Sequence, residues 1–469
     1  KKIIYVAPYL SILEQTSLAI QDAMKESALE HHSLAILDIE DEQRAAESQL
    51  AMEAWAHSIV CTSFNQFWRA IFPKRAQDVL RRVFLKNSVI IIDEPQIFNS
   101  EVWNLFLCGL ESLTLLSNLK VIFLSATMPP FIYGLSKTPT TLQVKAPAGY
   151  DRYKLNFIEE KKDEISLVSF LRQKEYSSQA VILNTIEDAY QVYKKVNENE
   201  DIKDKDKIYL LHGLMTPLHK TIIIEEIKRA LSNSEFPLYV ISTQVLEAGV
   251  DVSFQHVARA LSVLPSIVQA AGRVNRHNEG TDSGVISVFP FYRTGEIDTR
   301  SYIYPKNLQK ITDRLLSVRT SWAETELAVL VQKYYKEMFS QNTYEAILAS
   351  IKDAYQGDWE QVSKSEPFGK DFLKLPLFMP WDPDKAVKEI LSKKLKKFIF
   401  LQEKFEVANG YDVYDLYMDS SYMAKLSFED RKQLMILFHH YVINLPVKKA
   451  LQIASKEDYI NNRIPILYG

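Results

Sequence analysis

Residues 89–98 read VIIIDEPQIF, a strongly apolar strand sequence that runs directly into two acidic side chains. Burying Asp93 and Glu94 beside such a strand costs free energy unless a cation or a hydrogen-bond donor pairs with them. In doubly wound parallel sheets, ligands bind at the carboxyl ends of the strands. The stretch therefore predicts a parallel sheet with an acidic ligand site at its edge. Asp-Glu pairs are also common in surface turns, so the site needs support from elsewhere in the chain.

The N-terminal part of the chain alternates β-rich runs with amphipathic helical patterns. Apolar strands that lack polar alternation and are separated by helices indicate a parallel sheet covered on both faces. The expected strands are 2–7, 34–38, 57–62, 88–93 and 120–125. The expected helices are 11–29, 64–72, 76–85 and 101–115.

The same pattern begins again after a connector at residues 146–151, which predicts a second α/β lobe. Its expected strands are 180–183, 207–211, 237–242, 257–261 and 284–289, with helices at 185–196 and 218–232. The later sequence favours helices, at 308–318, 325–339, 344–355 and 386–405. We therefore expect an α/β protein with parallel-sheet lobes at 1–147 and 148–297, followed by a mostly helical region at 298–469.

Composition excludes several classes of protein. The chain has 47% apolar and 25% charged residues, which is typical of a globular protein. No apolar run is long enough to span a membrane, and no signal peptide opens the sequence. Cys61 and Cys108 lack metal-ligand spacing and predict no disulfide framework, which favours a reducing, cytoplasmic location. The net charge of −3 means that any nucleic acid would bind at a local surface.

Three further motifs support a phosphate site. SAT (125–127) ends the strand after the acidic pair, and TQVLEAGVD (243–251) follows a strand of the second lobe. In QAAGRVNR (269–276), a helical periodicity would place Gln269, Arg273 and Arg276 on one face. Two arginines on one face suit the neutralisation of charge on a transferring phosphate, although a solvated arginine face has the same pattern. The order of the motifs, at intervals that suit two lobes, favours one shared site.

These motifs resemble those of superfamily 2 helicases, the DExD/H-box motors, and more narrowly those of the CRISPR-associated helicase of type I interference systems. The narrower resemblance covers roughly the part of the chain up to residue 290. It rests on IIYVAPYLSILEQT (3–16), SIVCTSFNQF (58–67), SVIIIDEPQIF (88–98), FLSATMP (123–129), STQVLEAGVDVSF (242–254) and SIVQAAGRVNRHNEG (266–280). It implies two tandem RecA-like lobes, followed by a linker helix and a C-terminal cap.

The resemblance also implies a site for ATP and Mg²⁺. Asp93 would hold the metal and Glu94 would activate the attacking water. Pro95 departs from the small or aliphatic residue usual in the family, which leaves the local backbone open but both carboxylates in place. The other residues implied in the catalytic or nucleotide site are Gln96, Ser125, Thr127, Gly249, Asp251, Gln269, Arg273 and Arg276.

The resemblance implies a second set of residues that contact the phosphates of single-stranded DNA. This set suits tracking along a strand without sequence preference. His212 belongs to it through the LLHG stretch at 210–213, although a histidine in a plain turn would have the same sequence. The set is Pro8, Thr62, Thr185, His212 and Thr243.

No G-x-x-x-x-G-K-[ST] motif occurs, and Gly369-Lys370-Asp371 lacks both the glycine spacing and a preceding strand. Without this loop the chain has no backbone cradle or lysine for the β- and γ-phosphates. We therefore expect the sequence to start partway into a longer protein, and to be inactive by itself. No His-Asp dipeptide of an HD nuclease occurs, so a nuclease would lie upstream or on a separate chain.

The predicted function is that of an ATP-dependent single-stranded DNA translocase or helicase in the cytoplasm of a prokaryote. The resemblance implies recruitment by a guide-RNA surveillance complex, with 3′-to-5′ movement. One alternative is another superfamily 2 motor, such as an RNA helicase or a restriction-type translocase. A second alternative, favoured by the missing phosphate loop, is a docking module that does not hydrolyse ATP.

Overall fold

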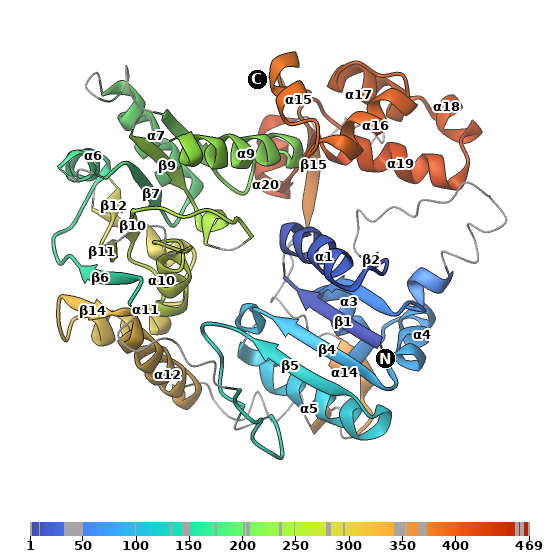
Figure 1. The fold of residues 1–469 in the computed structure, drawn as a ribbon, viewed down its shortest axis with the longest axis horizontal. Coiled ribbons are helices and arrows are strands. Elements are labelled where there is room, and N and C mark those ends of the chain that lie inside the picture. Colours follow the sequence, from blue (N-terminus) through green and yellow to red (C-terminus); the bar gives the residue numbers. More distant parts are fainter. Residues whose placement is uncertain are drawn as a thin grey trace.

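The structure is a computed structural model of the chain. The residues that it describes are 2–8, 10–31, 50–98, 100–131, 134–142, 151–173, 176–199, 202, 207–233, 237–247, 249–277, 283–293, 296–341, 352–353, 356–363, 365, 373–454, 459 and 464–467. Figure 1 shows two α/β lobes and a group of helices at the C-terminal end. The predicted fold class is confirmed.

The first lobe contains a five-stranded, fully parallel sheet in the order β2-β3-β1-β4-β5. Its strands are β1 Lys2–Ala7, β2 Leu29–His31, β3 Ile59–Ser63, β4 Ser88–Asp93 and β5 Lys120–Leu124. Its helices are α1 Leu10–Met24, α3 Phe64–Ile71, α4 Ala76–Leu85 and α5 Ser100–Ser117. The predicted strand at 34–38 lies outside the described residues. Strand β2 was not predicted, and it begins at Leu29, the last residue of the helix predicted at 11–29.

One edge of this sheet is open. In the described part of the chain, β5 pairs with β4 alone, so its outer backbone groups have no ladder partner. Val121 and Phe123 pack against the apolar core. Ile122 and Leu124 point to the other face and are 37% and 44% exposed. The last strand of the sheet therefore has both an unpaired edge and uncovered apolar side chains.

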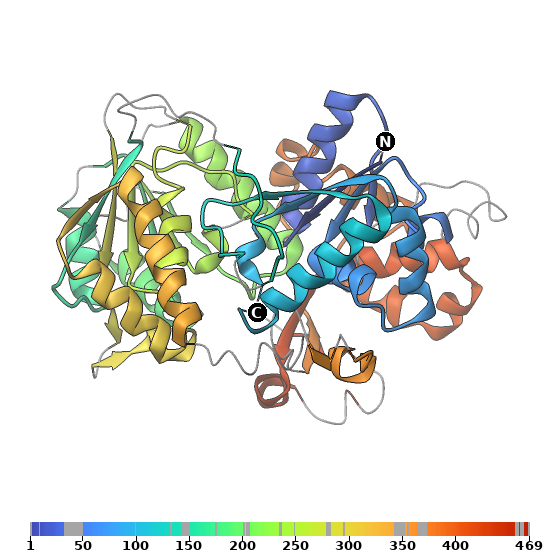
Figure 2. The ribbon, with the colours of Figure 1, turned by 90° about the horizontal axis from the view of Figure 1, so that it is seen from below.

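The second lobe contains a seven-stranded sheet in the order β14-β6-β11-β10-β7-β9-β8, in which β14 alone is antiparallel. Its strands are β6 Tyr153–Phe157, β7 Ser178–Ile182, β8 Lys207–Leu211, β9 Leu238–Ser242, β10 His256–Ala260, β11 Gly284–Phe289 and β14 Ser321–Ala323. Its helices are α6 Glu164–Arg172, α7 Ile186–Glu198, α9 Pro217–Asn233 and α10 Leu264–Ala271. Because β14 joins β6, this sheet extends past residue 297, where the sequence predicted the lobe to end. Figure 2 shows the two lobes side by side.

The C-terminal part is mostly helical. A hairpin of β12 Tyr292–Arg293 and β13 Ile297–Asp298 leads to α11 Lys306–Leu316 and α12 Glu324–Gln341. The later elements are α14 Trp359–Ser363, β15 Lys374–Phe378, α15 Lys385–Ile390, α16 Lys396–Lys404, α17 Gly410–Met418, α18 Ser420–Lys425, α19 Phe428–His439, β16 Val442–Pro446 and α20 Val447–Ile453.

The structure departs from the predicted helices of this part at one place. The helix predicted at 386–405 is two helices, α15 and α16, because the turn between them buries Leu391 and Leu395 in the C-terminal core. Packing thus overrides the local helix preference. The helix predicted at 344–355 lies largely outside the described residues. Among the helices described, none is both long and apolar enough to cross a bilayer.

A single apolar core connects the two lobes. It includes Trp103 and Phe106 of α5, Leu155 and Val257 of the second sheet, and Tyr335 of α12. A separate core, which includes Phe378, Phe438 and Tyr441, holds the C-terminal helices together. Helix α12 therefore links the lobes, while the C-terminal helices have a second core, to which Leu218 and Ile222 of α9 also belong.

We expect Gly410→Ala to lower the free energy of unfolding of the C-terminal helices by about 1–3 kcal/mol. The added methyl group would lie 2.9 Å from Pro380 Cα and 2.9 Å from the Tyr441 ring, and the backbone cannot yield cheaply. Gly213→Ala is the control, because its nearest neighbour would be Val245 Cγ2 at 4.0 Å. Thermal unfolding monitored by circular dichroism checks this; equal midpoints for the two variants would contradict it.

Candidate nucleotide site

A cavity of about 260 Å³ lies between the two lobes. Its first-lobe lining comes from β1, from the end of β4 and from α1. Its second-lobe lining comes from the segment after β9, from α10 and from the turn that follows α10. The predicted residues that it brings together are Asp93, Glu94, Gly249, Asp251, Gln269, Arg273 and Arg276. Lining residues that the sequence did not single out are Tyr5, Ile12, Thr16, Glu247 and Val250. Acidic and basic groups from opposite lobes thus face one space.

Asp93 is the last residue of β4, where the carboxyl end of the strand opens onto the cavity. The Tyr5 hydroxyl donates a 2.6 Å hydrogen bond to Asp93 Oδ2. Burial, and then this bond to a carboxylate, raise the pKa of Tyr5 above its ordinary value, so it remains a donor at neutral pH. Tyr5 therefore holds one oxygen of Asp93 in place. Tyr5 lies in the predicted strand KIIYVA, which is β1. Its contact with Asp93 depends on the pairing of β1 with β4, which no sequence motif reveals.

Glu94 has a left-handed backbone, with φ 55° and ψ 48°. Its amide donates to the carbonyl of Leu124 at 2.9 Å, and Pro95 then begins a short 3₁₀ turn, Pro95–Ile97. Such a conformation in a non-glycine residue costs of order 1 kcal/mol and persists only where its surroundings hold it. It turns the side chain out of the strand direction. Burial raises the pKa of Glu94, while Gln96, Arg273 and Arg276 act in the opposite direction.

Gln96, Ser125 and Thr127 lie behind Glu94 and do not line the cavity. The Gln96 amide donates to Glu94 Oε2, and Ser125 Oγ donates to Gln96 Oε1 at 2.6 Å. The Thr127 amide donates to Ser125 Oγ at 2.9 Å. Tyr335 of α12 then donates to the Thr127 carbonyl at 3.2 Å. A continuous chain of hydrogen bonds therefore links Glu94 to the helix that joins the lobes.

The helix predicted to carry both arginines ends before them. Helix α10 stops at Ala271 with Gly272 at its C-cap, and the Val274 backbone then forms a bridge with Phe254. Gln269 is helical, whereas Arg273 and Arg276 lie in the following turn. The prediction of one helical face is wrong, because the bridge to Phe254 and the positive φ of Asn275 (45°) end the helical path. All three side chains nevertheless reach the cavity.

Arg273 is held by its own lobe. It is 7% exposed, and its guanidinium donates to the Val250 carbonyl at 2.6 Å and to the Glu247 carbonyl at 2.6 Å. Gly249, with φ 84°, provides the turn that brings both carbonyls to one cation. Burial, followed by the neighbouring charge of Arg276, lowers the pKa of Arg273 to about 10, so it stays cationic at neutral pH.

Arg276 is more open. Its Nε lies 3.0 Å from Asp251 Oδ1, and both side chains are well exposed, at 39% and 49%. An exposed pair of this kind contributes little stability and exchanges partners easily. Arg276 is therefore the arginine of the site that a new anion can recruit at low cost.

Glu247 belongs to the TQVLEAGVD stretch but received no predicted role. Its carboxylate is fully buried, 2.9 Å from Arg259 Nε, and accepts a hydrogen bond from Ser266 Oγ at 2.8 Å. Burial raises the pKa of Glu247, and Arg259 and Ser266 oppose that shift. Since its carbonyl also binds Arg273, Glu247 fixes the loop that presents this arginine.

The predicted strand-contacting residues lie away from the cavity. Thr62 is fully buried and its hydroxyl donates to the His31 carbonyl at 3.0 Å, so in this structure it presents no surface to a strand. Thr243 is also buried, at 4% exposed. Thr185 caps α7 by accepting from the Asp188 amide at 3.1 Å. Pro8 and His212 are partly exposed and remain available.

The residues present suit a magnesium-bound nucleotide in part. Mg²⁺ in phosphate sites keeps several waters and needs only one or two carboxylates, which Asp93 supplies. Arg273 and Arg276 line the same cavity from the other lobe. Within the part of the chain that the structure describes, no group of three or more His, Cys, Asp or Glu side chains is arranged to hold a metal.

Comparisons with known proteins agree with the resemblance. Residues 175–279 match the family described as CRISPR-associated nuclease/helicase Cas3, C-terminal. A CRISPR-associated nuclease/helicase Cas3 of Haloferax volcanii is 23% identical over 398 residues, which covers 62% of this chain and 42% of that relative. The chain therefore spans less than half the length of this relative. The predicted resemblance to the CRISPR-associated helicase is confirmed.

Solved structures show the same fold. The crystal structure of T. fusca Cas3 matches with a TM-score of 0.69 and 14% identity, over 97% of this chain and 60% of that one. A chain in a structure of a CRISPR RNA-guided surveillance complex, pre-nicking, matches with a TM-score of 0.53 and 16% identity, over 81% of this chain and 56% of that one. At these identities the likeness concerns the fold.

We expect Glu94→Gln to raise the thermal midpoint of unfolding, by an amount that depends on pH. Because the folded pKa of Glu94 is raised, the wild type loses stability as pH rises from the unfolded carboxyl value of about 4.3 through the folded value. The neutral variant keeps that stability. The difference in thermal midpoint between Glu94→Gln and the wild type should therefore be largest at pH values above the folded pKa of Glu94. It should shrink as the pH falls below the unfolded value.

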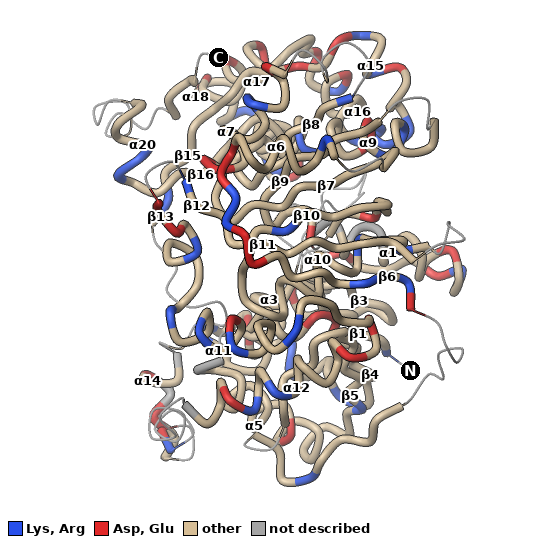
Figure 3. The backbone as a smooth tube through the Cα atoms, turned by 90° about the vertical axis from the view of Figure 1, so that its left-hand side faces the viewer, with Lys and Arg blue, Asp and Glu red and all other residues tan. Residues whose placement is uncertain are grey.

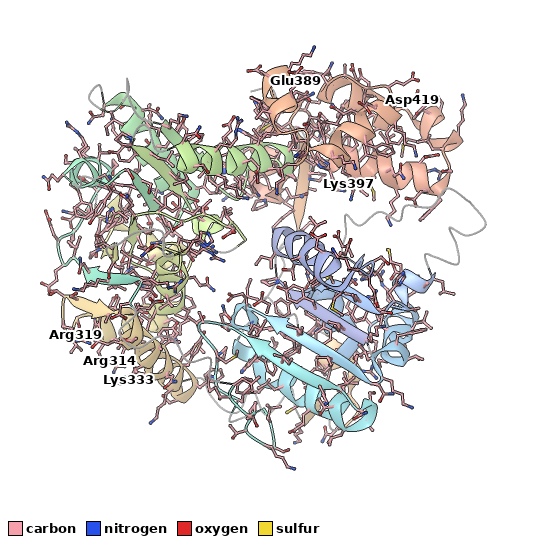
Figure 4. All side chains as sticks on the ribbon, in the orientation of Figure 1. Arg314, Arg319, Lys333, Glu389, Lys397 and Asp419 are labelled. Atoms are coloured by element: carbon pink, nitrogen blue, oxygen red, sulfur yellow. The ribbon has the colours of Figure 1, made fainter. Side chains whose placement is uncertain are left out.

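Thermal midpoints measured across a pH series check this prediction. Glu389→Gln is the control, because Glu389 lies exposed on α15 (Figure 4) and its neutralisation should leave the pH profile unchanged. A Glu94→Gln advantage that is the same at all pH values would contradict the proposed burial cost.

Proposed function

We propose that this chain is the motor part of an ATP-dependent helicase that moves along single-stranded DNA in CRISPR type I interference. One observation carries the proposal: carboxylates of the first lobe and arginines of the second line one cavity between the lobes. The similarity to Cas3 supports the biological setting.

Within the cavity, each group has a role that its position suits. Asp93, held by Tyr5, would bind Mg²⁺, which would offset the charge of the nucleotide phosphates. Glu94, whose pKa is raised, would orient the attacking water and accept a proton from it. Arg276 and Arg273 would neutralise charge on the transferring phosphoryl group. Gln269 would contact the same phosphate from α10.

The hydrogen-bond partners of the arginines suggest how the cycle moves the lobes. In this structure Arg276 pairs with Asp251, and Arg273 is bonded to backbone carbonyls of its own lobe. A nucleotide anion held by the first lobe would compete for Arg276 and draw the second lobe toward it. Hydrolysis would remove that attraction. The chain from Glu94 to Tyr335 would pass the change to α12.

ATP hydrolysis also needs a phosphate-binding loop, and the sequence contains no G-x-x-x-x-G-K-[ST]. We propose that residues outside this sequence supply it. The open edge of β5, with Ile122 and Leu124 uncovered, can accept a further strand beside the cavity. The 469-residue chain mixed with ATP and single-stranded DNA should therefore show no turnover. Stoichiometric hydrolysis by the chain alone would overturn this part of the proposal.

The proposed partners are single-stranded DNA and a guide-RNA surveillance complex. The net charge of −3 and the mixed distribution of charges along the chain (Figure 3) require local contacts rather than a wholly basic face. The match within a structure of such a complex supports the second partner. We propose that nuclease activity, which the name of the relatives includes, resides in a further domain or a separate chain.

Two alternatives can be separated from this proposal. An RNA helicase or a restriction-type translocase would share the cavity, and ATPase stimulation by single-stranded RNA but not DNA in the full-length protein would favour it. A docking module that does not hydrolyse ATP is favoured by the missing phosphate loop. It would give no ATP turnover even when such a loop is joined to the chain.

In a polypeptide that joins this chain to its phosphate loop, we expect Arg276→Ala to lower ATP turnover by roughly a hundredfold or more. Nucleotide binding should remain, because most binding contacts would come from the first lobe. Turnover and nucleotide affinity are measured separately, by phosphate release and by displacement of a fluorescent nucleotide. Arg314→Ala, at an exposed position of α11 (Figure 4), is the control. An unchanged rate for Arg276→Ala would exclude it from phosphate chemistry.

A further inference from the structure

The second lobe meets the C-terminal helices at the start of α9. Leu218 is fully buried in the C-terminal core, and its amide donates to the His440 carbonyl at 3.2 Å. Figure 1 shows α9 reaching from the second sheet to the C-terminal helices. This junction contains positively charged and aromatic side chains to which neither the motifs nor the cavity assigns a role.

Two aromatic rings from different parts of the chain stack across the junction. His219 of α9 and Trp381, which follows β15, have ring centroids 4.0 Å apart and an interplanar angle of 23°. Both side chains are partly exposed. Burial lowers the pKa of His219, so its ring is neutral at physiological pH. A flat aromatic pair that is not fully buried offers a surface on which a further ring can stack.

A lysine next to His219 has no carboxylate partner among the described residues. Lys220 is largely buried, which lowers its pKa, and within the described chain it forms no ion pair. His212, the partly exposed histidine of LLHG, lies close enough that Lys220 and His219 lower its pKa, after burial itself. The first turn of α9 contains no acidic residue, so the helix dipole adds to this positive potential.

The nearby hydrogen-bonding groups are otherwise occupied. The His219 amide donates to Thr216 Oγ1 at 3.2 Å. Asp382, next to Trp381, accepts from the Tyr441 hydroxyl at 2.7 Å and from the Gly410 amide at 2.6 Å. Lys388 Nζ lies 3.7 Å from the same carboxylate. Asp382 is thus compensated within the C-terminal helices, whereas Lys220 is not compensated by any described carboxylate.

We propose that Trp381, His219 and Lys220 form a second contact site for single-stranded DNA, in which a base stacks on the aromatic pair and a phosphate binds Lys220. Base-aromatic stacking combined with a backbone cation is how proteins bind single strands without sequence preference. The inference rests on the proposed function for its choice of ligand. It assigns to the C-terminal helices a direct share in holding the strand, through Trp381.

The test is binding of a labelled oligothymidylate to the 469-residue chain, without nucleotide, over a series of salt concentrations. Trp381→Ala should weaken binding about tenfold and leave the salt dependence unchanged, since it removes stacking. Lys220→Ala should also weaken binding and should lower the slope of log affinity against log salt by about 0.7, the loss of one single-strand phosphate contact. Trp381→Phe should restore most of the affinity.

Lys333→Ala is the matched control, because Lys333 is exposed on α12, away from the C-terminal helices (Figure 4). Thermal unfolding of each variant separates lost packing from lost contact. Quenching of a 2-aminopurine base by the wild type but not by Trp381→Ala would identify the stacking partner.

The outcomes distinguish this inference from the proposed function. Wild-type binding that neither Trp381→Ala nor Lys220→Ala weakens would overturn the second contact site and leave the motor proposal intact. A wild-type chain that does not bind single-stranded DNA would overturn both the contact site and the DNA part of the proposed function. A lower unfolding midpoint for Trp381→Ala with unchanged affinity would assign the stacked pair to domain packing alone.

Discussion

Carboxylates of the first lobe face arginines of the second lobe across one cavity, and the arrangement of the site depends on this electrostatic complementarity. The first lobe places Asp93 and Glu94 at the end of a buried strand, and burial acts against the charge of Glu94. The second lobe supplies Arg273 and Arg276 to the same cavity. Among the described residues, no cation of the first lobe pairs with Asp93 or Glu94, and Arg273 binds backbone carbonyls rather than a carboxylate of its own lobe. A ligand that carries both a metal cation and phosphate anions is complementary to both sides at once.

The supporting residues explain why these charges can be held in place. Tyr5 fixes Asp93 from a neighbouring strand, and Gln96 and Ser125 support Glu94 from behind. In the second lobe, the buried pair of Glu247 and Arg259 anchors the loop whose carbonyls bind Arg273. A buried ion pair adds little net stability compared with apolar packing, but losing one partner is costly. The network therefore specifies a geometry more than it stabilises the fold.

Much of the fold was predictable because the core strands are continuous apolar runs. β4 and β11 begin and end where the sequence predicted, and β8 does too. The sequence did not predict β14, because its three residues acquire a strand conformation only by pairing with β6. Likewise, the end of α10 depends on the bridge between Val274 and Phe254, which is set by the tertiary structure. Local periodicity cannot detect either constraint.

The candidate site was predictable to a similar extent. Residues in motifs, such as Asp93 and Arg276, reach the cavity, because the carboxyl ends of parallel strands share one edge. Tyr5 and Thr16 were missed, since their place depends on strand order. Ser125 and Thr127 lie one layer behind the cavity, and Thr62 is fully enclosed by packing. The roles of all these residues remain predictions.

The exposed margin of β5 has a consequence for handling the molecule. No described strand pairs with its outer amides and carbonyls, which can therefore form hydrogen bonds with an extended peptide. The exposed side chains of Ile122 and Leu124 add an apolar surface to this edge. Two copies of the chain could join their sheets margin to margin at high concentration. The chain would then self-associate and precipitate for a reason unrelated to its biology, and a short strand-forming peptide added during purification would keep it monodisperse.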